Sequence, residues 1–451
     1  MSLPSGRSPQ DQKASAVQGA LLSPKARKGQ PVVAVLPFLD LRDQGGEEYL
    51  TEGIAEEILQ ALNQVEGLWV VSRTTSFHYG GTGLTLAEAG HQLGADTILG
   101  GTLLQREKSL TLTAELIEVA SNRAIWSEAF DFQRWDLFAT LERISKGVLT
   151  ALGFSASIQS RYPVDLEAYE YYLKARQCFF MFNRQGMARA AKLFRKALDI
   201  DPAYASAWAG LANCAAYAYI YAERTEPQRE LAESCSSKAL ELDPDLAEAH
   251  ASRGVALSAA GRAEEAESAF ETALCLNPNL YEAAYFYARH CFAAGKAERA
   301  IEYFEWAATL RPEDFQAILL VAQVYHSLGL EDEAERARRA GLALVQERLE
   351  YAPDDARARY MGANALVALG EREKGLTWAH MARSMDPDDP MLLYNLGCIH
   401  ALADDPEEAL DCLELAVAGG LTQLDWFRHD SDLDALRSLP RFGALMTSLE
   451  A

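Results

Sequence analysis

The sequence predicts a small α/β sandwich domain followed by a long α-helical solenoid. Three observations support this fold class. A proline returns at intervals near 34 residues through the C-terminal two thirds, a small–aromatic–small pattern precedes several of these prolines, and short β-branched runs are confined to the first 154 residues. A chain of 451 residues with 49% apolar residues exceeds what one core can hold, so we expect at least two structural regions.

The charge of the chain bears on its partners. A formal net charge of -23 argues against general nucleic acid binding, which depends on Lys and Arg clusters.

Residues 1–30 form a basic, Ser- and Gly-containing tail, and we expect this tail to be disordered. The tail has no apolar run typical of a secretory signal, and no stretch is long enough to span a bilayer. We therefore expect a cytoplasmic protein, and its seven scattered cysteines favour reduced thiols.

Residues 31–154 alternate short strands with amphipathic helices. Pro31 to Phe38 is a β-branched run bounded by prolines, which predicts a buried strand. The later elements are a helix over 47–63, a strand over 68–72, a helix over 84–93, strands over 97–105, 109–119 and 123–132, and a helix over about 134–152. This βαβαβββα order is typical of a small sheet with helices packed on it.

The same region resembles the amino-terminal domain type of TolB and the related FlgO-like domains. The resemblance is carried by Ala34–Phe38 (AVLPF), Val71–Phe77 (VSRTTSF) and Leu93–Asp96 (LGAD). It implies a domain of the kind that is fused to repeat arrays in bacterial regulators and cyclases. Where relatives tend to show Tyr-Lys-Gly, this chain has Tyr79-Gly80-Gly81, which weakens a ligand role for that loop.

The repeat occupies residues 155–420. Its marker prolines are Pro202, Pro244, Pro278, Pro312, Pro353 and Pro387, and three of the five intervals between them are 34 residues. Upstream, Ala190, Phe194 and Ala197 recur as Ala266, Phe270 and Ala273, then as Ala300, Phe304 and Ala307. Such spacing places one stripe on one helical face. Over about residues 166–420 the sequence resembles the tetratricopeptide repeat family, in about seven units.

Two of the units are longer than the others. The insertions fall at about residues 217–230 and 341–350, where the pattern also changes: Ser236 replaces the aromatic in one unit, and Arg338 and Gly341 stand in the Phe and Ala places of the other. One interpretation is looser packing with longer helices. The other is a local break in the superhelix that shapes a pocket. Residues 421–451 lack the proline, and we expect them to form a helical cap on the array.

Signatures of catalysis are missing from the sequence. We find no phosphate-binding G-x-x-x-x-G-K-[ST] loop, no G-x-S-x-G elbow, no H-E-x-x-H and no paired C-x-x-C. His290-Cys291 and His400 near Cys398 have helical spacings that do not bring the side chains face to face. The sequence therefore predicts a protein that is not an enzyme and has no cofactor or metal site.

The resemblance to tetratricopeptide repeats implies an extended inner face lined by the first helix of each unit. Its second, fifth, ninth and twelfth positions point there, and they include Asn213, Tyr285, Arg289, Phe292, Gln323, His326, Arg357, Tyr360, Asn364 and Tyr394. This mixture suits peptide recognition, because aromatic and Arg side chains dominate binding hot spots. A plain solvated surface is the alternative. Some relatives grip a terminal carboxylate with Lys here, but Ser206, Glu248, Glu282 and Gln316 fill those places, so we do not predict that clamp.

Two functional hypotheses follow from these patterns. The first is an interaction scaffold or regulatory adaptor that binds a protein or peptide on the inner face of the repeats. The second is a signalling module in which the α/β domain senses a small molecule or nucleotide. The second hypothesis rests on the family habit of fusing this domain to cyclase, kinase or DNA-binding parts, none of which we recognise in this sequence.

Overall fold

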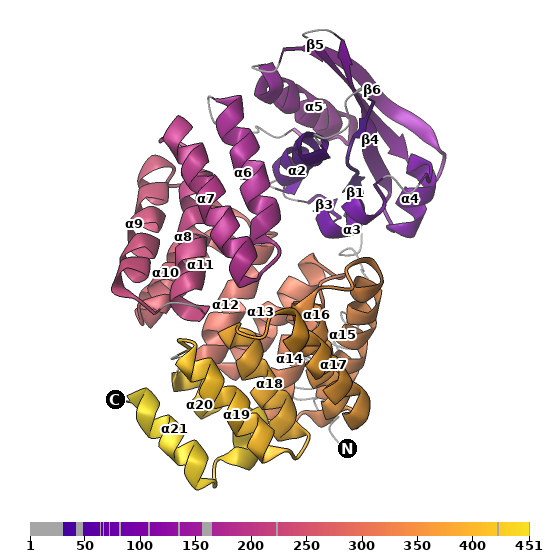
Figure 1. The fold of residues 1–451 in the computed structure, drawn as a ribbon. Coiled ribbons are helices and arrows are strands. Elements are labelled where there is room, and N and C mark those ends of the chain that lie inside the picture. The colour runs from indigo at the N-terminus through magenta and orange to yellow at the C-terminus, as the bar shows by residue number, and fades with distance from the viewer. Residues whose placement is uncertain are drawn as a thin grey trace, which may run out of the picture.

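The computed structural model describes residues 30–41, 48–63, 65, 67–71, 73–80, 83–106, 109–133, 136–155, 165–221, 224–421 and 424–450. The tail predicted over residues 1–30 lies almost entirely outside the described residues. Figure 1 shows a mixed sheet with its helices at one end of the molecule and a long array of paired helices over the rest. The predicted fold class is confirmed.

The sheet combines a parallel part with an antiparallel meander. Its strand order is β3-β1-β4-β5-β6, and a short strand β2 pairs with β4. β1 runs parallel to both of its neighbours, whereas β4, β5 and β6 are antiparallel to one another. The strands are β1 (Val32–Val35), β2 (Leu39–Asp40), β3 (Trp69–Val70), β4 (Thr97–Arg106), β5 (Ser109–Glu118) and β6 (Arg123–Phe132).

Helices cover both faces of this sheet. Val33 and Val35 of β1 belong to the core that includes α2 (Glu48–Asn63) and α5 (Leu137–Ala151). The alternate residues of the strand, Val32 and Ala34, pack with α4 (Leu86–Gln92). Burial on both faces explains why the predicted strand is a continuous apolar run.

Two short elements of this region were not predicted from the sequence, namely β2 and the helix α3 (Arg73–His78). Both are too short to show a hydrophobic period. The predicted strands and the three longer helices are present, with bounds that differ by a few residues.

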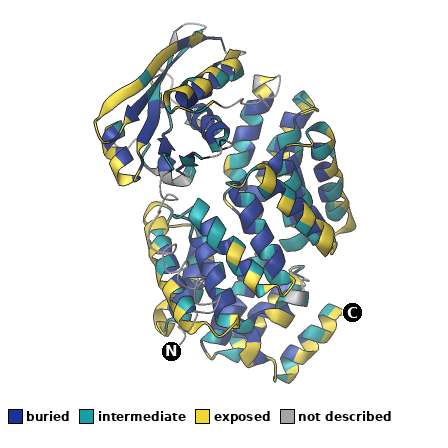
Figure 2. Ribbon diagram, turned by 180° about the vertical axis from the view of Figure 1, so that it is seen from behind, coloured by how far each residue is buried: buried dark blue, intermediate teal, exposed yellow. Residues whose placement is uncertain are grey.

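Seven pairs of antiparallel helices follow within the described residues. They are α6 (Leu166–Phe179), α7 (Arg184–Ile200), α8 (Ala205–Tyr221), α9 (Glu226–Leu242), α10 (Ala247–Ala259), α11 (Ala263–Leu276), α12 (Tyr281–Ala293), α13 (Ala297–Leu310), α14 (Phe315–Ser327), α15 (Glu331–Tyr351), α16 (Ala356–Ala368), α17 (Arg372–Met385), α18 (Pro390–Leu402) and α19 (Pro406–Ala418). Figure 2 shows buried residues on the sides where helices face one another. No described helix combines the length and apolarity that crossing a bilayer requires.

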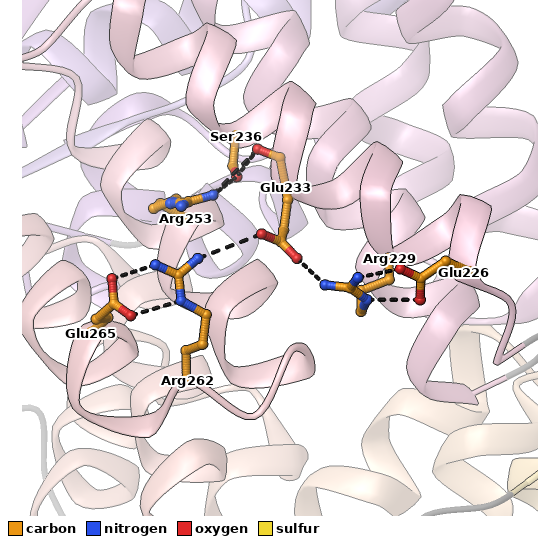
Figure 3. A network of polar contacts seen from close by, with 7 residues as sticks. All are labelled: Glu226, Arg229, Glu233, Ser236, Arg253, Arg262 and Glu265. Atoms are coloured by element: carbon orange, nitrogen blue, oxygen red, sulfur yellow. Dashed lines mark hydrogen bonds and ion pairs between the residues drawn. The ribbon is translucent and has the colours of Figure 1, made fainter.

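The insertions lengthen helices. α8 and α9 each have 17 residues, against 13 in α10 and 14 in α11, and α15 has 21. In the first of the two longer units, the buried Ser236 stands where several other units have an aromatic side chain. Arg253 donates to the Ser236 hydroxyl at 3.4 Å and to the Glu233 carbonyl at 3.3 Å, as Figure 3 shows. Hydrogen bonds thus replace ring packing at this position.

The sheet region and the repeats share one apolar core. A single cluster of buried residues runs from β1 through α2 and α5 into α6, α7 and α8. The closest approach is between α2 and α6, where a Cβ added to Gly53 would lie 2.2 Å from Cδ1 of Leu173. Beside it, Tyr169 donates its hydroxyl to the Gly53 carbonyl at 3.3 Å, and Arg176 pairs with Glu56 at 2.7 Å. Glycine at position 53 therefore sets how closely the two regions pack.

This close approach can be tested with Gly53→Ala in the full-length chain. The added methyl group must displace the buried Leu173 side chain, so we expect a loss of about 1–3 kcal/mol in the free energy of unfolding. Urea denaturation measures this change. Gly443→Ala in α21 is the matched control, because no atom lies within 4 Å of the added Cβ and alanine favours a helix. Equal stability of Gly53→Ala and the native chain would contradict the proposed packing.

Candidate binding site on the inner face of the repeats

The first helices of the repeat pairs enclose a cavity of about 250 Å³, which we name the inner chamber. Residues from α8, α10, α12, α14 and α18 line it, and Trp426 from the C-terminal segment forms part of its wall. Most of the lining is aromatic or apolar, with a few polar groups such as Asn213 and Arg289. This composition is typical of sites that hold a ligand in one orientation.

The longer α8 shapes the chamber. Tyr221 lies on the last turn of α8, beyond the 13 residues that α10 and α12 have, and it lines the cavity together with Tyr217, the thirteenth residue of α8. Their rings contact each other at 4.7 Å, and Tyr221 contacts Trp426 at 5.5 Å between ring centroids. At the first insertion the structure thus shows the longer helices of one interpretation and the pocket wall of the other.

Four of the residues predicted from the sequence meet in one polar cluster beside the chamber. Arg357 donates to the Tyr360 hydroxyl at 3.2 Å and to the Tyr285 hydroxyl at 3.4 Å, and Arg289 donates to the same Tyr285 hydroxyl at 3.5 Å. Arg357 also donates to the side-chain oxygen of Gln316 at 2.7 Å. Tyr285 itself is fully buried, so its phenolic oxygen positions both guanidinium groups.

Asn213 occupies the junction between two cavities. It lines the inner chamber and also a smaller cavity of about 130 Å³ between the repeats and the sheet region. Its side-chain oxygen is buried and accepts no hydrogen bond from the described residues. A buried acceptor without a donor is costly, so this oxygen marks a place where a ligand donor would be stabilising.

Three further predicted residues bind the chain's own C-terminal segment, which consists of α20 (Leu424–His429), the 3-10 helix η2 (Ser431–Leu436) and α21 (Pro440–Glu450). Gln323 donates to Asp430 at 2.9 Å, Tyr394 donates to Asp430 at 2.8 Å, and Asn364 donates to Asp432 at 2.8 Å. The segment expected to cap the last repeat therefore also turns into the inner face.

Asp430 and Asp432 are buried, with 8% and 3% of their surfaces exposed, and the charge of Arg338 offsets only part of the effect of burial on Asp432. Burial, and then the charge of Asp430, raise the pKa of Asp432 to about 7. Burial likewise raises the pKa of Asp430. Their oxygen atoms and the Cys398 sulfur lie within 4.8 Å of one another, but amide and hydroxyl donors already bind the carboxylates. We assign no ion to this group.

The remaining predicted residues divide between the chamber and its surroundings. Phe292 lines the chamber. His326 is not part of the lining, and its Nδ1 lies 2.8 Å from Glu331 near the end of α14. The sequence did not identify Tyr217, Tyr221, Trp426, Asp430 or Asp432 as site residues. The only local signals were the insertion in α8 and the Asp430-Ser431-Asp432 sequence of the cap.

A family profile described as a tetratricopeptide repeat matches residues 257–305. A relative from Rhizobium meliloti (strain 1021), named "Putative adenylate cyclase 3", is 27% identical over 266 residues, which are 57% of this chain and 45% of the relative. The chain thus spans less than half of the length of that relative.

Solved structures with a similar arrangement of helices include MamA, with 23% identity over 37% of this chain and 94% of the other and a TM-score of 0.30. They also include YrrB, described as a TPR protein with an unusual peptide-binding site, with 22% identity, coverages of 41% and 92% and a TM-score of 0.28. The human IFIT1 dimer with m7Gppp-AAAA has 14% identity, coverages of 90% and 84% and a TM-score of 0.46.

The raised pKa of Asp432 predicts a pH-dependent stability. The folded chain holds a proton on this group that the unfolded chain releases, so the group lowers stability as pH rises from about 4 to about 7. Asp432→Asn should therefore raise the melting temperature at about pH 8 and have little effect at about pH 4. Thermal unfolding at both pH values measures this difference.

The control for this prediction is Asp388→Asn, an exposed aspartate between α17 and α18. It should leave the melting temperature nearly unchanged at both pH values. A lower melting temperature for Asp432→Asn at about pH 8 would show that the ionised carboxylate stabilises the C-terminal segment, contrary to our interpretation.

Proposed function

We propose that this tetratricopeptide repeat protein, which carries an N-terminal mixed β-sheet region, is a non-enzymatic adaptor of the cytoplasm that binds a segment of a partner protein. The observation that carries the proposal is the inner chamber, an aromatic cavity with Asn213 and Arg289 in its wall. Aromatic and Arg side chains supply most of the energy in protein interfaces, so the lining matches a hot-spot pocket.

Asn213 supports a peptide as the ligand. A peptide carries a donor N–H at nearly every residue, and the free oxygen of Asn213 needs one such donor. The apolar side chains of the bound segment would then fill the space between Tyr221, Phe292 and Trp426. Burial of apolar surface against these rings would supply the affinity, while Asn213 would set the register of the segment.

A substitution that fills the chamber tests this proposal. Ala293 lines the chamber near the end of α12, and Ala293→Phe would occupy space that a ligand needs. Peptides selected by phage display on the immobilised full-length protein should bind Ala293→Phe at least about tenfold more weakly, as measured by fluorescence polarisation.

The matched control is Ala294→Phe, because Ala294 is exposed and does not line the chamber. It should leave the dissociation constant unchanged, and unchanged melting temperatures would show that both variants fold. The proposal fails if selection enriches no peptide, or if both variants bind the selected peptides as the native protein does.

A second candidate function is based on a separate, smaller cavity. The smaller cavity lies between α2 and α3 of the sheet region and the first repeats, and Arg73, Arg176 and Arg311 contribute to its wall. We propose a TolB amino-terminal-like identity for the sheet region and, as the alternative function, the sensing of a small anionic molecule in this cavity. The relative whose name refers to an adenylate cyclase is consistent with a signalling role.

Thermal-shift measurements on the full-length chain test the second candidate. Nucleotides should raise the melting temperature of the native chain, and Arg73→Gln should remove this shift because it deletes one guanidinium group of the cavity wall. Arg143→Gln is the control, since Arg143 is exposed on α5 and pairs with Glu128 away from the cavity. The absence of any shift with nucleotides would exclude nucleotide sensing.

A further inference from the structure

We infer that the inner chamber is a binding site for a carboxylate attached to an apolar or aromatic body, with Arg289 in its wall and Arg357 in the polar cluster beside it as the groups that bind the anion. The inference deepens the proposed function, on which it rests for the identification of a peptide as the ligand.

Arg289 and Arg357 lack a carboxylate partner. Within the described residues, neither guanidinium forms an ion pair with Asp or Glu, and the groups that most affect both are tyrosines. Two other arginines enclosed on the same side of the molecule differ in this respect, since Arg176 pairs with Glu56 at 2.7 Å and Arg311 pairs with Glu282 at 2.8 Å. Among the residues that the structure describes, these two partly buried cations thus have no counter-ion.

Partly buried cations without a counter-ion are unfavourable, because removal from water weakens their solvation and no opposite charge replaces it. Two carboxylates of this part of the structure already accept hydrogen bonds. Asp389 caps α18 by accepting from the Leu392 backbone at 2.8 Å, and Asp430, which lines the chamber with Arg289, accepts from Gln323 and Tyr394. An anionic ligand would therefore supply the charge that the described residues do not.

The geometry holds both cations at one point. Arg289 and Arg357 approach from different helices, α12 and α16, and both donate to the hydroxyl of Tyr285. Arg289 also lies over the ring of Tyr221, with 5.2 Å between the guanidinium carbon and the ring centroid. Tyr285 and Tyr221 thus fix the positions of the guanidinium groups before a ligand arrives, which lowers the entropy lost on binding.

The space beside Arg289 accepts an apolar group. The chamber continues from Arg289 to Phe286, Phe292 and Trp426. An anion without an apolar body would leave this surface in contact with water, whereas a side chain next to the carboxylate would bury it. The site therefore favours an acidic group next to an aromatic or aliphatic one over an inorganic anion.

This site differs from the lysine clamp with which some tetratricopeptide repeat relatives grip a terminal carboxylate. Glu282 and Gln316, which stand where that clamp would need lysine, bind Arg311 and Arg357 respectively. The positive charge comes from Arg289 and Arg357 instead. A peptide with an internal or C-terminal carboxylate and a free organic acid share the chemistry required, and the experiment separates the two sources.

The experiment uses the full-length protein and two kinds of probe. Peptides selected by phage display are resynthesised with each Asp or Glu replaced by its amide and with an amidated C-terminus. In parallel, thermal shift compares 3-phenylpropanoate with the neutral 3-phenylpropanamide. We expect at least one amide replacement to weaken peptide binding by about tenfold or more, and only the acid to raise the melting temperature.

The arginines are then changed singly to Gln and to Lys. Arg289→Gln and Arg357→Gln should remove the preference for the acid, whereas the Lys variants should keep part of it because they keep the charge. Arg359→Gln is the control, because its guanidinium donates to the Pro353 carbonyl and the Met381 sulfur, whereas that of Arg357 donates to Tyr285 and Tyr360. Circular dichroism melts establish that each variant is folded, and a Lys variant replaces any Gln variant that is not.

The outcomes separate this inference from the proposed function. If peptides bind but their amide forms bind equally well and the Gln variants are unaffected, the anion site is wrong and the adaptor proposal stands. If no peptide is selected but the acid stabilises the protein through Arg289 and Arg357, the site binds a small organic acid and the adaptor proposal fails. If neither probe binds, or sodium sulfate stabilises as well as the acid does, the inference is overturned.

Discussion

Close contact between a glycine and a bulky side chain holds the repeat helices together, and the inner chamber depends on it. A Cβ added to Gly254 would lie 2.8 Å from Phe270, and one added to Gly362 would lie 2.8 Å from Trp378. The rings fill the place of the missing side chains, so α10 approaches α11 closely, and α16 approaches α17 closely. With that side of each first helix committed to packing, the opposite side can carry the Tyr, Arg and Asn groups that face inward.

The repeats could be predicted from the sequence because their packing is periodic. Each unit repeats the same small and aromatic positions, so a local pattern reports the fold. Ser236 and the lengthened α8 broke the pattern, and there the sequence showed only that something differed. In the sheet region, β1 and the β4–β6 meander were long enough to show a hydrophobic period, whereas β2 and α3 were not.

The candidate site was predictable only in part. The resemblance to tetratricopeptide repeats implied that Tyr285, Arg289, Arg357 and Tyr360 lie on inward faces, and in the structure these residues meet. The hydrogen bonds from Gln323 and Asn364 to the C-terminal segment had no local signal, because Gln323 and Asp430 are 107 residues apart. A long-range hydrogen bond depends on how the whole array curves, and no window of sequence reports that curvature. The same holds for the lack of an ion pair at Arg289 within the described part of the chain, because it depends on where acidic side chains from distant segments lie.

The position of Asn213 and Phe179 has a consequence for how the two cavities communicate. Both residues line the inner chamber and the smaller cavity next to the sheet region, so the two spaces share a wall. A ligand that displaced this wall in one cavity would change the free energy of binding in the other, and thermodynamic linkage would make the effect equal in both directions. The shared wall is thus where binding in the smaller cavity would be felt in the inner chamber.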